Sequence, residues 1–262
     1  MQTVKIEVDP RGVARVTMWR PQVFNAFDET MIAELDAGLA QVISDAQVRV
    51  IVLAGEGRAF SAGADLQWMK RASTAGFDAN VADARGFAAM LHRLASAPKP
   101  TLARVQGLAL GGGVGLACAC DFAFAAEDAQ FAVSEARLGI LPSVIGPYLV
   151  NAVGQRQARR LALTAERIGA LEALALGLVF EVAAPEQLDA VLDRTITELL
   201  QNGPNALGEI KVLLSQLAVG PVTPEVRELT AQTIARVRAT AEARQGFDAF
   251  LGKRPAPWVR SA

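Results

Sequence analysis

The residues from Val48 to Ala54 form a near-continuous apolar run, and this run restricts the possible folds more than any other feature of the chain. A strand with one solvated face alternates apolar and polar residues, whereas a strand covered on both faces stays apolar throughout. Thr101–Val105 and Asp121–Ala126 are also predicted to be buried strands, and a helical period fills about Asp78–Ala97 between the runs. Strand and helix alternate in this way to about Val182, which predicts an α/β core with a largely parallel sheet.

Two strands and a helix are expected ahead of the run. Val4–Val8 and Val13–Trp19 alternate in character and can pair through the turn at residues 9–12. Asp28 is the expected N-cap of the helix, because apolar residues follow it at helical spacing. These residues are Ile32, Leu35, Leu39 and Val42.

The character of the chain changes after Pro185. The segments Glu186–Gln201, Asn205–Leu217 and Pro224–Phe250 all show a helical period, and Gly and Pro residues separate them. We therefore expect residues 1–185 to form the core and residues 186–262 to form a C-terminal helical region. No flexible linker lies between the two parts, so they are expected to fold as one unit.

Composition and charge exclude several classes of function. The 262 residues include 26 basic and 27 acidic side chains, a net charge of −1, which leaves no electrostatic footprint for nucleic acid or an anionic membrane. No basic segment followed by an apolar stretch opens the chain, so a bacterial-type cytoplasm is the expected location. Cys118 and Cys120 lie two apart on a predicted helix, so their side chains diverge and suit core packing better than a disulfide or a zinc site.

Two loops rich in glycine and other small residues follow predicted buried strands. In Gly57–Leu66, small residues from Ser61 to Ala64 allow a ligand to approach the backbone closely, and Asp65 is placed at the start of a helix. In Gly107–Ala117, three successive glycines open a helix and leave its first N–H groups uncrowded, a favourable place for negative charge. Neither a phosphate loop nor a clean dinucleotide fingerprint is present. Each loop alone also fits an ordinary structural turn.

Together the loops predict two N–H donors that converge on one oxygen, as an enzyme that forms an enolate or a tetrahedral oxyanion requires. A proton carrier is needed as well. Glu135 follows a short apolar strand, where partial burial would raise its pKa toward a useful range for an acid or base; the alternative is a surface carboxylate paired with Arg137. The single histidine, His92, lies on a predicted helix away from both loops, and no Gly-x-Ser-x-Gly motif is present.

With these residues in view, the sequence resembles the enoyl-CoA hydratase/isomerase (crotonase) family over nearly its full length. Each matching stretch is modestly specific, and all five in order are very specific. The stretches are Trp-Arg-Pro-Gln-Val-Phe-Asn25-Ala26, Ala-Phe-Ser-Ala-Gly-Ala-Asp-Leu66, Gly-Leu-Ala-Leu-Gly-Gly-Gly113, Phe-Ala-Val-Ser-Glu-Ala-Arg-Leu-Gly139 and Ala-Phe-Leu-Gly-Lys-Arg-Pro-Ala-Pro-Trp258.

The resemblance implies a spiral of ββα units with a C-terminal helical trimerisation region, in a homotrimer or a dimer of trimers. It implies a coenzyme A thioester as substrate and no metal or redox cofactor. The oxyanion-hole N–H groups would belong to Ala64 and Gly112. Residues implied in binding CoA or substrate are Ala62, Asp65, Leu66, Gly111, Phe250 and Lys253, of which the last two often act from the neighbouring subunit in family trimers.

One departure from the family pattern bears on the chemistry. The best-known hydratases carry two glutamates twenty residues apart; the second matches Glu135, and the first falls on Gly115. Glycine can neither position nor deprotonate water. A single glutamate is also found in the Δ3,Δ2-enoyl-CoA isomerases and in the bacterial methylglutaconyl-CoA and carboxygeranoyl-CoA hydratases.

The second of these branches resembles the chain over longer stretches. They are Phe-Ser-Ala-Gly-Ala-Asp-Leu-Gln-Trp-Met69, Gly-Val-Gly-Leu116, Ser-Glu-Ala-Arg-Leu-Gly139 and Ala-Arg-Arg-Leu-Ala-Leu-Thr-Ala-Glu-Arg167. We therefore expect an enoyl-CoA hydratase that uses Glu135. The alternatives are an isomerase that uses Glu135 alone and a non-catalytic member that binds CoA or RNA.

The same branch suggests what else lines the pocket. A distal carboxylate on the substrate would need a cationic or hydroxyl partner, for which Arg137 and Tyr148 are candidates. Trp68 and Met69 are expected to wall the acyl or pantetheine channel.

Overall fold

The computed structural model describes residues 1–259, and its centre is a six-stranded sheet in the order β1-β2-β3-β4-β6-β9. The strands β1 and β2 form an antiparallel hairpin, and all the other neighbours are parallel. The strands are β1 (Val4–Val8), β2 (Val13–Met18), β3 (Val50–Gly55), β4 (Thr101–Val105), β6 (Phe122–Ala126) and β9 (Glu181–Ala183). Every residue of β3 is buried, as its continuous apolar sequence predicts.

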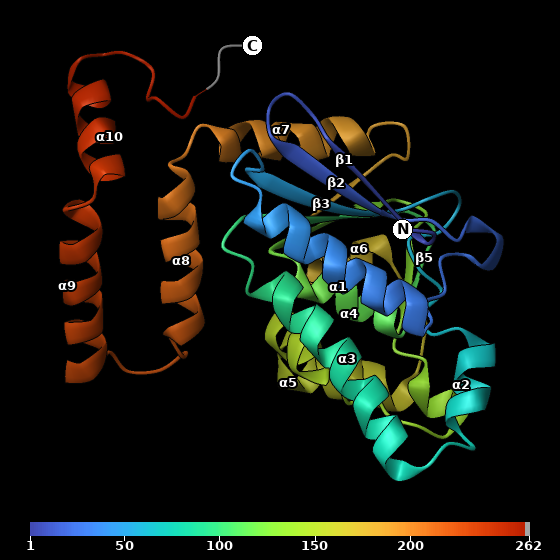
Figure 1. Cartoon of the computed structure of the whole chain (residues 1–262). Coiled ribbons are helices and arrows are strands. Elements are labelled where there is room, and N and C mark those ends of the chain that lie inside the picture. Colours follow the sequence, from blue (N-terminus) through green and yellow to red (C-terminus); the bar gives the residue numbers. More distant parts are fainter. Residues whose placement is uncertain (260–262) are drawn as a thin grey trace.

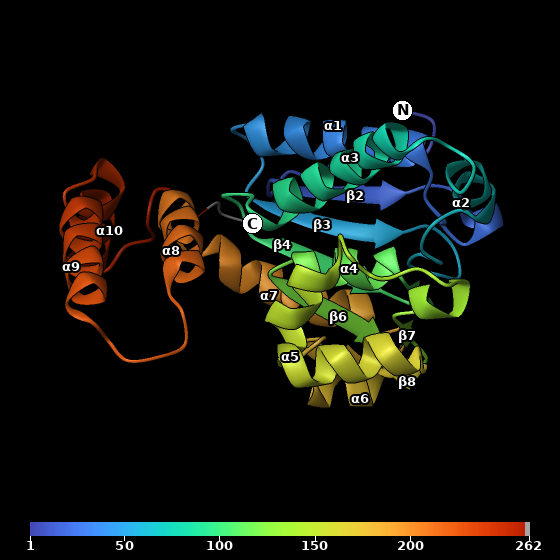
Figure 2. The ribbon, with the colours of Figure 1, turned by 90° about the horizontal axis from the view of Figure 1, so that it is seen from below.

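Helices cover both faces of this sheet (Figures 1 and 2). The larger core lies on the face covered by α1 (Glu29–Ser44), α3 (Phe77–Ala95) and α4 (Gly112–Ala119). The smaller core lies on the opposite face, where Leu188, Leu192 and Ile196 of α7 (Leu188–Leu200) pack against the strands. The helices α5 (Gly146–Thr164) and α6 (Ala170–Ala175) follow the later strands.

A second, smaller layer of strands explains why the loops after the main strands come together. It consists of β5 (Leu108–Leu110), β7 (Gln130–Ala132) and β8 (Ile168–Gly169). Bridges between Ser61 and Ala109 and between Phe27 and Ala64 extend the layer toward the chain after β3 and β2. The chain therefore leaves each strand of the main sheet, pairs with the preceding turn of the spiral and then enters a helix.

The last three helices project from the body of the molecule (Figures 1 and 2). They are α8 (Pro204–Gln216), α9 (Pro224–Arg238) and α10 (Ala241–Leu251). Large apolar side chains are exposed along them: Ile210, Val212, Leu214, Ile234, Phe247, Phe250 and Leu251. The single helical segment expected over Pro224–Phe250 is in fact two helices, because the chain turns at residue 239 and the Thr240 hydroxyl then accepts a bond from the Ala243 N–H.

Short elements complete the fold and agree with the sequence signals. Asp28 caps α1, as predicted, by accepting a hydrogen bond from the Met31 N–H. The remaining elements are η1 (Pro21–Val23), α2 (Leu66–Ala72) and η2 (Glu135–Leu138). Cys118 and Cys120 are unpaired and pack against the larger core, where burial raises the pKa of the Cys118 thiol to about 12. Within residues 1–259, no helix has the length and apolar character needed to cross a membrane.

Candidate active site

The loop between β3 and α2 presents the backbone of Ala64 to a cavity. The Phe27 N–H donates to the Gly63 carbonyl and the Asp65 N–H donates to the Phe27 carbonyl, each at 2.9 Å. These two bonds flank Ala64, so its own N–H points away from Phe27 and meets no acceptor within the described part of the chain. Gly63 has a φ of +85°, and a Cβ there would lie 2.6 Å from the Leu110 carbonyl oxygen, so this turn requires glycine.

The second predicted donor lies where α4 begins. The Gly111 N–H donates to the Ala132 carbonyl at 2.8 Å, which fixes the start of the helix against β7. Gly112 is the first helical residue, and within residues 1–259 its N–H has no acceptor. A Cβ at Gly63 would lie 3.6 Å from the Gly112 nitrogen, so the two loops are in direct contact.

Ala64, Gly112 and Glu135 line one cavity of about 290 Å³. Most of the other lining side chains are apolar: Phe27, Trp68, Met69, Ala72, Ala84, Phe87, Ile140, Leu141, Pro142, Val144 and Ile145. Asn80, Asp83 and Ser143 supply the remaining polar side chains of the lining. An apolar pocket with a few convergent polar groups is the usual form of a small-molecule site.

Glu135 is the first residue of η2 and is half-buried against the start of α4. A Cβ placed on Gly111 would lie 3.2 Å from the carboxylate oxygen Oε1, so the carboxylate faces the Gly111–Gly112 turn. The other oxygen, Oε2, is buried without a hydrogen-bond partner in the part of the chain that the structure describes. Burial raises the pKa of Glu135, and a hydrogen bond from its own backbone opposes this only in part. A carboxylate with a raised pKa is a stronger base than an ordinary one, as a residue that takes up and releases a proton in catalysis requires.

Gly115 stands where the best-known hydratases carry the first of their two glutamates, and the space beside it is occupied by another side chain. A Cβ at Gly115 would overlap Cγ2 of Ile145 and lie 2.8 Å from its Cβ. Ile145 is 2% exposed and also lines the cavity. The space that a side chain at residue 115 would enter is therefore occupied by hydrocarbon.

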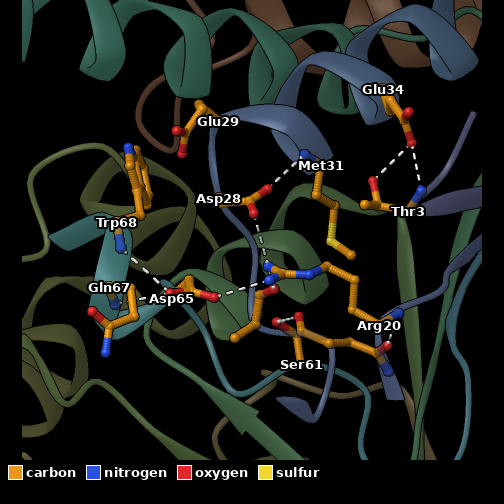
Figure 3. Close-up of polar contacts among 12 residues, drawn as sticks. Thr3, Arg20, Asp28, Glu29, Met31, Glu34, Ser61, Asp65, Gln67 and Trp68 are labelled. Carbon is orange, nitrogen blue, oxygen red and sulfur yellow. Dashed lines mark hydrogen bonds and ion pairs between the residues drawn. The ribbon is translucent and has the colours of Figure 1, made fainter. Parts of the chain in front are cut away.

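An ion-pair network holds the Ala64 loop in place. No pattern in the sequence predicted these ion pairs. Figure 3 shows the Arg20 guanidinium between the carboxylates of Asp28 and Asp65, at 3.1 and 3.0 Å. Asp65 also caps α2 through the N–H groups of Gln67 and Trp68. Desolvation acts to raise the pKa of Asp65, but these N–H groups and Arg20 outweigh it and lower the pKa.

Two fully buried polar residues continue this support. The Asn25 amide donates to the carbonyls of Glu56 and Ala59 at 2.8 Å, and its oxygen accepts from the Arg20 N–H at 2.9 Å. The Ser61 hydroxyl donates to the Asn25 carbonyl at 2.8 Å and accepts from the Gly63 N–H at 3.1 Å. Both residues lie in stretches that match the family, but the bonds from Asn25 to Glu56 and Ala59, and from Ser61 to Asn25, join residues too far apart in the sequence to be inferred.

The structure brings together only some of the residues predicted to contact CoA or substrate. Trp68 and Met69 line the cavity, as expected. Ala62 donates its N–H to the Phe24 carbonyl, and Leu66 is 69% exposed; neither lines the cavity. The Asp65 carboxylate is already bound within the network, its N–H donates to the Phe27 carbonyl, and its carbonyl accepts from the Met69 N–H.

Four other candidates lie outside the cavity. Phe250 is 82% exposed and Lys253 is exposed, both at the end of the projecting α10 and away from the body of this chain (Figure 1). Arg137 and Tyr148, the candidate partners of a distal carboxylate, are not among the residues that line the cavity. Arg137 is exposed to solvent, and Tyr148 packs against the larger core.

Comparison with known proteins places this fold in one family. The family description "Enoyl-CoA hydratase/isomerase" matches residues 9–261. The chain belongs to this family. Both the mixed α/β fold with its parallel sheet and the family expected from the sequence are thus confirmed.

Individual relatives match over most of their length. A structure of an enoyl-CoA hydratase from Shewanella pealeana superposes with a TM-score of 0.94 at 40% identity, covering 98% of this chain and 96% of that one. Pseudomonas aeruginosa AtuE superposes with a TM-score of 0.93 at 41% identity, covering 98% and 100%. A crotonyl-CoA hydratase from Syntrophomonas wolfei is 34% identical over 250 residues, 92% of each protein.

Proposed function

We propose that the protein is a hydro-lyase that adds water across the double bond of an α,β-unsaturated acyl-CoA. The observation that carries the proposal is that Ala64 and Gly112, whose N–H groups have no acceptor within residues 1–259, line one cavity with the half-buried Glu135. Relatives named enoyl-CoA hydratases support the same reaction.

In the proposed mechanism the thioester oxygen accepts hydrogen bonds from the Ala64 and Gly112 N–H groups. Water adds at the β carbon, the π electrons move toward the thioester, and the resulting enolate oxygen is stabilised by the same two donors. Glu135 takes the proton from water and delivers it to the α carbon. The raised pKa makes the Glu135 carboxylate a stronger base toward water, and the acid that forms can still protonate the α carbon because the enolate carbon is far more basic.

A second candidate reaction, migration of the double bond from the 3- to the 2-position, is favoured by the contact between Gly115 and Ile145. That contact leaves Glu135 as the one half-buried carboxylate of the described cavity lining, since Asp83 is exposed. Moving a proton from the α to the γ carbon needs one carboxylate and no water. Both reactions pass through an enolate oxyanion. Hydration forms it by attack of water at the β carbon, and isomerisation forms it by removal of the α proton.

The finer proposal for the substrate is a branched enoyl-CoA of the methylglutaconyl-CoA or carboxygeranoyl-CoA type, which the longer sequence stretches support. The described lining contains no lysine or arginine, so a distal carboxylate would meet the Ser143 hydroxyl or the Asn80 amide. Ala62, Asp65 and Leu66 would bind CoA beside the Gly111–Gly112 turn. Phe250 and Lys253 would act on CoA from a neighbouring subunit of a trimer or a dimer of trimers.

The test is to assay 2-enoyl-CoA hydration and 3-enoyl-CoA isomerisation on the purified protein, with straight and branched acyl groups. We expect hydration to be faster, with branched substrates bearing a carboxylate preferred. Fast isomerisation with little hydration would contradict hydration and support the second candidate. No turnover of either class, together with salt-sensitive RNA binding, would identify a non-catalytic member.

A further inference from the structure

The contact between Gly115 and Ile145 does more than explain an absent glutamate. Gly115 lies inside α4, and alanine at such a helical position normally stabilises a helix relative to glycine. Here a Cβ would overlap Ile145 Cγ2. Glycine at residue 115 is therefore required by the side chain at residue 145, and the two positions form a matched pair.

Ile145 has little freedom to make room. It is 2% exposed, and it is the N-cap residue of α5, where its carbonyl accepts the Leu149 N–H at 3.0 Å. Its branched Cβ restricts the side-chain torsion, and the larger core surrounds it. A glutamate at residue 115 would have to displace this packed side chain from the wall of the cavity.

The chemical consequence concerns water. A bound water requires two to four polar partners, and Ile145 and its neighbour Val144 contribute only hydrocarbon side chains to the wall of the cavity. The other carboxylate of the described lining, Asp83, is exposed and accepts a hydrogen bond from the Trp68 indole N–H at 3.3 Å. A water that reacts in this cavity is therefore oriented by Glu135 without a second buried carboxylate.

We propose that Ile145 is the residue that decides between one-carboxylate and two-carboxylate chemistry at this site. This rests on the proposed function, because it assumes that the cavity binds an enoyl-CoA. Ile145 excludes a carboxylate from the Gly115 position and keeps that wall of the cavity apolar. Exchange of the pair, Ile145→Gly with Gly115→Glu, would place a second carboxylate where the best-known hydratases of the family carry one.

The packing part of the proposal is tested without any assay of activity. Gly115→Ala is expected to lower Tm in the wild type and to lower it much less, or to raise it, in an Ile145→Gly background. Val144→Gly is the matched control: it also removes a hydrocarbon side chain from the cavity wall, yet Gly115→Ala should stay destabilising in it. An equal effect of Gly115→Ala in all three backgrounds would overturn the pairing.

The chemical part is tested by hydration of a straight-chain 2-enoyl-CoA. The Ile145→Gly/Gly115→Glu variant is expected to be at least about tenfold faster than Ile145→Gly alone. Its pH profile should gain a second ionisation, which a change in packing alone would not add. A folded double variant with neither gain would overturn the proposal.

The outcomes separate this proposal from the proposed function. If the wild type turned over no enoyl-CoA, the function would fail while the Tm comparison still decided the pairing. If Gly115→Glu alone folded with an unchanged Tm and hydrated faster than the wild type, Ile145 would not be what excludes the carboxylate. If the double variant did not fold, the alanine comparison would still decide whether the two side chains compete for one space.

Discussion

Glu135 combines two properties that rarely coexist in a carboxylate: it is half-buried, and one of its oxygens has no partner in residues 1–259. A buried carboxylate without a charged partner costs stability, and proteins retain such groups chiefly at functional sites. The small residues at the start of α4 leave room for this side chain beside the Gly112 N–H. The burial that weakens the fold at this point is what makes the carboxylate a better base.

The first prediction follows from this burial. Because the pKa of Glu135 is raised above its ordinary value of 4.5, the ionised base is present above the raised pKa and is lost as pH falls through it. We expect kcat/KM for hydration to fall on the acid side with a midpoint above 4.5. The measurement is the pH profile of kcat/KM. A midpoint at or below 4.5 would show that Glu135 is not the base that limits the rate.

The buried hydroxyl of Ser61 gives a second prediction. Ser61→Ala removes the acceptor of the Gly63 N–H and the donor to the Asn25 carbonyl, and unsatisfied buried groups cost about 1–3 kcal/mol. We expect a loss of that size in urea unfolding, together with slower hydration because Ala64 follows directly. Ser73→Ala, at an exposed helix end, is the control and should change neither quantity.

The donors and the carboxylate could be predicted from the sequence, whereas the groups that hold them could not. Small residues after buried strands indicate the two donor loops locally, and the family resemblance supplied the positions Ala64 and Gly112. The role of Asn25 depends on carbonyls that lie 31 and 34 residues away in the sequence, and that of Ile145 depends on its contact with Gly115 on another helix. Such contacts form only when distant parts of the chain fold together, so no local sequence pattern predicts them.

At the scale of the elements, the sheet was predictable because each strand carries its own signal. The fully apolar β3 required helices on both faces, and α1 and α3 on one side and α7 on the other supply them. From the sequence alone, α7 was grouped with the C-terminal helices because its apolar residues recur at the same helical spacing. Its packing depends on which face of the sheet is still uncovered, and that is set by the chain as a whole.

A third prediction concerns how α7 is held. Asp189 on α7 accepts both bonds of the Arg104 guanidinium on β4, at 2.8 and 2.9 Å, and one from Arg15 on β2 at 3.1 Å. The Arg104 bonds, with help from Arg15, lower the pKa of Asp189 from 3.8 to about 2. The resulting stability is fully present above pH 3.8 and is lost as pH falls through about 2.

Asp189→Asn should therefore lower the free energy of unfolding at pH 7, by about 1 kcal/mol or less because the carboxylate is largely exposed. The difference from the wild type should shrink at pH 3. Urea unfolding at the two pH values measures it. A difference that is equal or larger at pH 3 would show that the ion pair is not its source.

At the scale of the whole molecule, the projecting helices expose apolar side chains to solvent. Side chains such as Phe247, Phe250 and Leu251 lie on α10, which stands away from the body (Figures 1 and 2). Large exposed apolar patches usually mark interaction surfaces. The family resemblance predicts that the partner is a second copy of the chain, which no property of a single chain indicates.

The fourth prediction is that the protein in solution has three or six times the chain mass of 27.7 kDa. Light scattering measures this directly, and a monomer would contradict it. Phe250→Ala and Lys253→Ala should then raise KM for the acyl-CoA more than they lower kcat. Phe77→Ala, at an equally exposed position of 82% outside the cavity, should leave both constants unchanged.

The most direct test is the turnover of Glu135→Gln on the best 2-enoyl-CoA substrate. The substitution keeps the shape of the side chain and removes its ability to carry a proton, so hydration should fall by about 10²–10⁴. Tm should not fall, because glutamine carries no buried charge. Turnover within about tenfold of the wild type would contradict a mechanism in which Glu135 is the one carboxylate that moves the proton.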